Sequence, residues 1–125
     1  MKPILSTGID MIEIKRFEET VNRQGIKFLN RIFTEKELAD CAGRMESLAA
    51  RFAAKEAASK ALGCGIGKIS WQDLEITKSG DNQPGIILHR EAFILADSLN
   101  LSTWSISISH TRELAIAFVV AMGET

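Results

Sequence analysis

The sequence has few cysteines, few prolines and no long apolar run. Two cysteines, Cys41 and Cys64, stand among its 125 residues. They are too few for a disulfide framework or for the four ligands of a closed zinc site, so we expect reduced thiols. The longest uncharged apolar stretch, Leu114–Met122, is far shorter than the roughly 18 residues of a membrane-spanning helix. The N-terminus lacks the apolar segment of about 7–15 residues that marks a signal peptide. We therefore expect a cytoplasmic protein without a membrane partner.

The sequence also has little net charge. The formal charge is −1 and the pI is about 6.1, which argues against a protein that binds nucleic acid by bulk charge. Hydrophobic residues make up 46% and charged residues 25%, so the chain is too apolar and too nearly neutral to be intrinsically disordered. A chain of this length forms one core comfortably and two poorly. We predict a single domain over residues 1–125.

Hydrophobic spacing and turn residues predict an α+β fold. Residues 103–110 alternate between polar and apolar and are followed closely by the apolar strand 114–122, so the two must form an antiparallel hairpin. The fold class is therefore a helical first half packed on a mostly antiparallel sheet. The expected helices are 13–24, from Thr34 to about Ala42, 47–62 capped by Ser47 and stopped by Gly63, and 91–99; the other expected strands are 4–12, 74–78 and 86–89.

The helix 47–62 carries two charged residues on an otherwise small, apolar stripe. Steps of three and four residues place Glu56 and Lys60 on the face that also carries Ala49, Phe52, Ala53 and Ala57. A carboxylate on such a face is costly unless it has a partner. Taken alone, the helix favours an ordinary Glu–Lys pair one turn apart, which stabilises a helix by a few tenths of a kcal/mol.

A second carboxylate, Asp10, interrupts the first apolar strand. An aspartate between Ile9 and Met11 is compatible with an outward-facing or turn residue. The functional interpretation pairs Asp10 with Glu56, because two carboxylates together with substrate phosphates are a usual way to hold Mg²⁺. Lys60 would then face the same phosphates. Mn²⁺ suits the same oxygen ligands.

Three other patterns are weaker. The turn Gly63–Gly67 follows a helix, which excludes a P-loop or a dinucleotide-binding fingerprint, although it could bring backbone N–H groups to an anion. His110 ends a strand, but neither Ser107 nor Ser109 lies in a glycine-flanked nucleophile elbow, so we reject an acyl-transfer triad. Nothing in the sequence indicates a Cys64–His110 pair. The basic residues of 14–31 are either a solvated helix face or a docking patch for an acidic partner.

Three segments together resemble a known family. They are GIDMIEIKRFEE (8–19), RFAAKEAASKALGCGIG (51–67) and SISHTRELAIAFVV (107–120). In this order and spacing they resemble the holo-acyl-carrier-protein synthases, the 4'-phosphopantetheinyl transferases of fatty-acid synthesis. The central segment is the most specific of the three. One departure is Asn82-Gln83-Pro84, where the family often has Gly-Lys-Pro.

The resemblance implies roles for individual residues. Asp10 and Glu56 match the Mg²⁺ ligands, and Lys60 matches a lysine that contacts the phosphates. Coenzyme A would bind near Arg51, His110 and the turn that contains Gly63 and Gly65. Arg16 matches an arginine of the first helix that meets the acidic carrier protein. The family forms compact homotrimers with active sites between subunits.

The implied reaction is phosphoryl transfer from coenzyme A to a serine of apo acyl carrier protein, with adenosine 3',5'-bisphosphate as the leaving group. Three alternatives stay open at this point. A non-catalytic module that binds coenzyme A or a nucleotide would not need both carboxylates. A Mg²⁺-dependent phosphohydrolase would use water in place of the serine. A purely structural trimer subunit would account for the alanines but would leave the two charged residues of the helix stripe unexplained.

Overall fold

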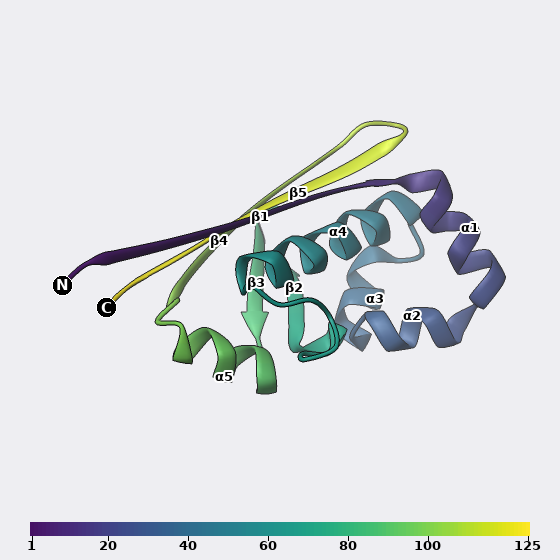
Figure 1. The fold of residues 1–125 in the computed structure, drawn as a ribbon. Helices are drawn as coiled ribbons and strands as arrows, with labels where there is room; N and C mark the ends of the chain where they lie inside the picture. The colour runs from purple at the N-terminus through teal and green to yellow at the C-terminus, as the bar shows by residue number, and fades with distance from the viewer.

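A computed structural model describes residues 1–125, and its central feature is a three-stranded antiparallel sheet in the order β1-β5-β4 (Figure 1). The strands are β1 (Pro3–Glu13), β5 (Leu114–Glu124) and β4 (Thr103–His110). β1 and β5 pair along their whole length, from Pro3↔Glu124 to Glu13↔Leu114. The predicted hairpin of β4 and β5 is confirmed. The two chain termini lie together at one end of the sheet (Figure 1).

The long helix α4 (Met45–Ala61) covers one face of this sheet. Alanines dominate the contact, because Ala53 and Ala57 of the helix and Ala117 of β5 have no exposed surface. Gly8 of β1 makes the closest approach: a Cβ at this position would lie 1.8 Å from the carbonyl oxygen of Ala57. Small residues on both elements thus let the helix backbone lie directly against the strand, which positions Glu56 beside Asp10.

The other elements surround α4. Helices α1 (Ile14–Gln24), α2 (Ile26–Ile32) and α3 (Glu35–Cys41) gather at one end, around a cluster of phenylalanines and Trp71 (Figure 1). A second, two-stranded antiparallel sheet pairs β2 (Leu74–Lys78) with β3 (Pro84–Leu88). The 3₁₀ turn η1 (Trp71–Asp73) precedes β2, and α5 (Arg90–Ser98) follows β3. The α+β class is confirmed, as is the stop of α4 at Gly63, whose φ is 74°.

Three predictions were wrong, and one helix was not predicted. Helix α2 was not predicted, because its seven residues are too few to show a clear period. Ser47 lies inside α4, whose N-cap is Arg44, so the helix begins earlier than the predicted cap at Ser47. His89 is the N-cap of α5 and not a strand residue, while β3 begins at Pro84. The antiparallel strands form two sheets and not one, because β2 and β3 pair only with each other.

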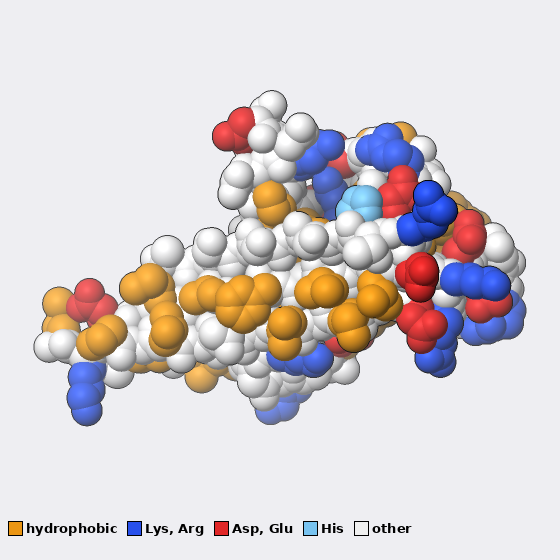
Figure 2. Space-filling model, turned by 90° about the horizontal axis from the view of Figure 1, so that it is seen from above, with side chains coloured by type: hydrophobic (Ala, Val, Ile, Leu, Met, Phe, Trp, Pro, Cys, Tyr) orange, Lys and Arg blue, Asp and Glu red, His pale blue; other side chains and the backbone are white.

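The face of the three-stranded sheet that points away from α4 is apolar and uncovered. Alternate residues of β1 and β5 form it, and Figure 2 shows them as a continuous row along the molecule. Their large side chains have exposed fractions from 40% to 68%; they are Leu5, Ile9, Met11, Phe118 and Met122. Exposed contiguous apolar patches on soluble proteins mark interaction surfaces. No helix of the chain is long and apolar enough to cross a membrane.

Candidate functional site

The structure brings Asp10, Glu56 and Lys60 together between β1 and α4. The Lys60 ammonium donates to the Ile9 carbonyl oxygen at 2.8 Å and to Asp10 Oδ1 at 3.2 Å. The Asp10 side chain is 19% exposed, while the Lys60 side chain is 52% exposed and reaches it from the solvent side. The sequence-based alternative, a Glu56–Lys60 ion pair within the helix, is wrong, because Lys60 bonds across to β1 and forms no ion pair with Glu56.

Glu56 lies within the field of the same groups. Its pKa is raised above the ordinary value, chiefly because burial disfavours the charged form and also because of the negative charge of Asp10; Lys60 opposes both. Two carboxylates thus converge where only one cationic side chain serves them. A divalent cation at this point would relieve that repulsion, and hard oxygen ligands are the ones that Mg²⁺ prefers. Since no group of three or more metal-binding side chains exists, the remaining ligands would have to come from substrate and water.

The glycine turn lies directly after Lys60. Gly63 and Gly67 have φ values of 74° and 138°, a region that side chains rarely adopt. No atom lies within 4 Å of the position that a Cβ would take at Gly63, Gly65 or Gly67. The turn is therefore an open stretch of backbone, accessible to a ligand that also contacts Lys60. Burial raises the pKa of the Cys64 thiol, which keeps it protonated and argues against its use as a nucleophile.

Arg51 and His110 lie together, but in a different place. They line a cavity of about 270 Å³ whose walls also include Arg44 and Lys78. Arg51 is buried and donates to the Ile76 carbonyl oxygen at 2.9 Å, with Asp40 Oδ2 at 3.5 Å. The cavity thus collects three cationic side chains and a histidine around a single carboxylate, that of Asp40, and the excess of positive charge suits an anionic ligand. This cavity is not lined by Asp10, Glu56, Lys60 or the glycine turn.

Arg16 occupies a third location, on α1. Its side chain is 80% exposed and makes only a loose contact with Glu13, at 3.6 Å. It borders a largely apolar cavity of about 420 Å³, lined among others by Phe17, Phe28 and Phe52. Figure 2 shows basic and acidic side chains side by side at the same end of the molecule. Arg16 is therefore free to meet a partner.

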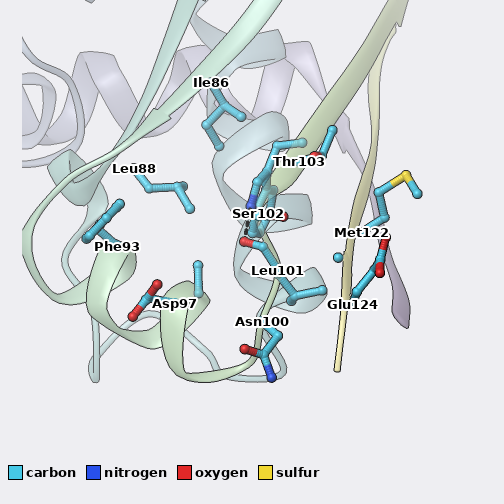
Figure 3. Close-up of a pocket in the computed structure, with 13 residues that line it drawn as sticks. Ile86, Leu88, Phe93, Asp97, Asn100, Leu101, Ser102, Thr103, Met122 and Glu124 are labelled. Carbon is cyan, nitrogen blue, oxygen red and sulfur yellow. Dashed lines mark hydrogen bonds between the residues drawn. The ribbon is translucent and has the colours of Figure 1, made fainter. Parts of the chain in front are cut away.

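A larger cavity, of about 740 Å³, contains no predicted site residue (Figure 3). It lies between β3, α5 and the end of the β4–β5 hairpin, and its side chains include Phe93, Leu101 and Trp104. Its only ionisable residues are acidic, Asp97 and Glu124. A cavity without a cationic side chain is a poor place for a phosphate ester, so it is not the candidate site.

A buried ion pair next to Glu56 was not predicted from the sequence. Lys55, next to Glu56, and Glu37 of α3 are both fully buried and lie 2.8 Å apart. Glu37 was predicted only as part of a capping box, and that prediction is confirmed. The available signal was the position of Lys55 on a helix that is alanine-rich on all sides, with Ala54 directly before it and Ala58 three residues after it.

Comparison with known proteins supplies independent information. Residues 6–119 match the family model described as the 4'-phosphopantetheinyl transferase superfamily. A holo-[acyl-carrier-protein] synthase of Herpetosiphon aurantiacus is 43% identical over 96% of this chain and 100% of its own length. The crystal structure of the Helicobacter pylori synthase in complex with coenzyme A has a TM-score of 0.84 at 43% identity, over 92% of this chain and 98% of that one. The crystal structure of the Bacillus anthracis synthase in complex with CoA (3',5'-ADP) has a TM-score of 0.81 at 36% identity, over 98% of this chain and 100% of that one.

Proposed function

The chain belongs to the 4'-phosphopantetheinyl transferase superfamily, and from this premise we propose that it transfers 4'-phosphopantetheine from coenzyme A to a serine of an apo acyl carrier protein. The products are the holo carrier protein and adenosine 3',5'-bisphosphate. The observation that carries the proposal is the convergence of Asp10 and Glu56 with Lys60 beside an open glycine turn. A module that only binds coenzyme A would not need two carboxylates to converge.

Asp10 and Glu56 would hold Mg²⁺, which supplies charge neutralisation at the pyrophosphate oxygens when bound. Lys60 adds a positive charge on the same side, and its exposed ammonium can leave the Ile9 carbonyl to bind a phosphate oxygen. The serine oxygen forms a bond to the phosphorus that bears the pantetheine arm, while the bond from that phosphorus to the bridging oxygen breaks. The serine proton leaves through water, because a carboxylate engaged with a cation is a poor base.

The two regions that carry cationic side chains lie apart within one copy of the chain, and this separation indicates how copies could assemble. Asp10, Glu56 and Lys60 face one region, while Arg51 and His110 line another cavity. A single coenzyme A can use both if the carboxylates of one copy face the cavity of the next. The uncovered apolar face of β1 and β5 is a suitable contact for such copies. We therefore include in the proposal a homotrimer with active sites between subunits.

The acidic carrier protein would dock at Arg16 and the neighbouring basic residues of α1 and α2. The exposure of Arg16 and its weak contact with Glu13 leave its charge available for a partner. The proposal places this encounter in the cytoplasm, with Cys41 and Cys64 as free thiols.

The test is incubation of the purified protein with apo acyl carrier protein, coenzyme A and Mg²⁺, followed by the intact mass of the carrier. We expect a gain of one phosphopantetheine group. The Asp10→Ala, Glu56→Ala double variant should lose at least about a hundredfold in rate, and chelation of the metal should have the same effect. An unmodified carrier would refute the proposal, and release of the bisphosphate without any carrier would indicate a hydrolase instead.

A further inference from the structure

One edge of strand β2 has no neighbouring strand, and side chains form the hydrogen bonds that a third strand would otherwise make. β2 pairs only with β3, so half of its backbone groups point away from its sheet. Three charged side chains bind them. Lys55 Nζ donates to the Leu74 carbonyl oxygen at 2.8 Å, Glu37 Oε2 accepts from the Ile76 N–H at 2.8 Å, and Arg51 Nη1 donates to the Ile76 carbonyl oxygen at 2.9 Å. Helices α3 and α4 therefore hold β2 through its backbone.

The Glu37–Lys55 pair is the centre of this attachment. Each of the three ammonium hydrogens of Lys55 has an acceptor: Glu37 Oε1 at 2.8 Å, the Trp71 carbonyl oxygen at 3.0 Å and the Leu74 carbonyl oxygen. Glu37 Oε1 also accepts from the Thr34 N–H at 2.8 Å. A buried ion pair often adds little stability compared with apolar side chains of similar size, so stability alone is a weak reason for it. Its hydrogen bonds do fix where β2 lies against α4.

Strand β2 also forms part of the wall of the cavity of about 270 Å³ that Arg51 and His110 line. Ile76, Thr77 and Lys78 of β2 line that cavity together with Arg51. Arg51 lies one turn before Lys55 on α4 and binds the same β2 residue, Ile76, that Glu37 binds. The distance between Arg51 and Lys78 thus depends on where the ion pair holds the strand.

We propose that Glu37 and Lys55 are positioning residues for coenzyme A binding: they fix β2 on α4 so that Arg51 and Lys78 present their charges to one anionic group. The inference rests on the proposed function. Neither residue is exposed, so neither can touch the substrate, and their effect passes through the strand. Loss of the pair should weaken the binding of coenzyme A and leave the docking of the carrier protein and the chemical step nearly unchanged.

The test is a double variant, Glu37→Leu with Lys55→Met, which replaces the pair by apolar side chains of similar size. We expect the KM for coenzyme A to rise about tenfold, with kcat and the KM for the carrier within about twofold of the wild-type values. The milder variant Glu37→Gln covers the case in which the double variant does not fold. A glutamine has one carbonyl oxygen, which the charged Lys55 ammonium attracts more strongly than a neutral N–H does, so the Ile76 N–H loses its acceptor.

Amide hydrogen exchange gives a readout that does not depend on activity. In either variant the Ile76 amide should exchange faster, while the amide of Val119, in the core of β5, should keep its rate. The matched control is Arg90→Met, which removes a 2.8 Å ion pair with Asp73 next to the same strand but away from the cavity, and should change neither KM.

Two results would overturn the inference: an unchanged KM for coenzyme A although the Ile76 amide exchanges faster, or equal effects on kcat and both KM values. Failure of the proposed function would look different, because the wild-type protein itself would then transfer nothing.

Discussion

Glu56 is the residue whose chemistry depends most on its surroundings. Burial and the charge of Asp10 raise its pKa above the ordinary glutamate value of 4.5. At pH values between the ordinary and the raised pKa, Glu56 is therefore mostly protonated in the folded chain and mostly ionised in the unfolded chain. Without metal, protonated Glu56 contributes to the stability of the folded state at pH values below its ordinary pKa. This contribution is lost as the pH rises through the raised pKa. A bound cation needs the ionised form, so its affinity should increase over the same pH range.

These opposite trends can be measured as melting temperatures against pH, with chelator and with Mg²⁺. We expect the stabilisation by Mg²⁺ to be small near pH 4 and to grow as Glu56 ionises. Glu56→Gln removes the titrating group, so its melting temperature should respond little to Mg²⁺ at any pH. Equal Mg²⁺ stabilisation of the variant and the wild type would exclude Glu56 as a ligand.

Arg16 gives a second prediction at this scale. Its side chain is exposed and only loosely paired, so Arg16→Ala should leave stability unchanged. The KM for the acidic carrier protein should rise about threefold to tenfold, less so at high salt, while the KM for coenzyme A stays the same. Lys2→Ala, an exposed cation at the other end of β1, is the matched control. Equal effects of Arg16→Ala on both KM values would contradict a docking role.

At the scale of elements, the contact of β1 with α4 sets the distance between the two carboxylates. A Cβ at Gly8 would lie 1.8 Å from one backbone atom of α4 and 2.9 Å from another, so Gly8→Ala must push the helix away from the strand. We expect a loss of at least about 2 kcal/mol in the free energy of unfolding, together with a large loss of transfer activity. Denaturant titration and the carrier mass assay measure the two effects.

Gly80→Ala is the control for this substitution, because no atom lies within 4 Å of the added carbon and the backbone is not in the positive-φ region. It should keep both stability and activity. A Gly8→Ala protein as stable and active as the wild type would show that α4 can move without affecting the site.

Local signals in the sequence predict several of the elements correctly. The period of β4, the capping box at Thr34 and the stop at Gly63 are local signals, and each gave the correct element. The pairing of Asp10 with Glu56 needed an assumption about distant segments, and the structure places them together. The attachment of β2 could not be predicted, because Lys55 and Glu37 bind backbone atoms of Leu74 and Ile76, and backbone atoms carry no sequence signal.

At the scale of the whole molecule, the proposed trimer makes each active site a shared one. Phe118→Glu would place a charge in the middle of the uncovered apolar face, where Phe118 is 40% exposed. If that face joins the copies, sedimentation should show the wild-type protein at three times 13.8 kDa and the variant at a lower mass. A folded variant with unchanged mass would show that the copies use another surface.

Mixing two inactive variants tests whether the active site is shared. Asp10→Ala lacks a carboxylate, and Arg51→Ala lacks a cation of the other cavity; each should be nearly inactive alone. After the two are unfolded and refolded together, a site is complete only where an intact carboxylate face meets an intact cavity. In a closed ring this happens at about a quarter of the sites, so about a quarter of the wild-type activity should return. If each copy carries its own complete site, mixing restores nothing, because every site in the mixture then contains one of the two substitutions.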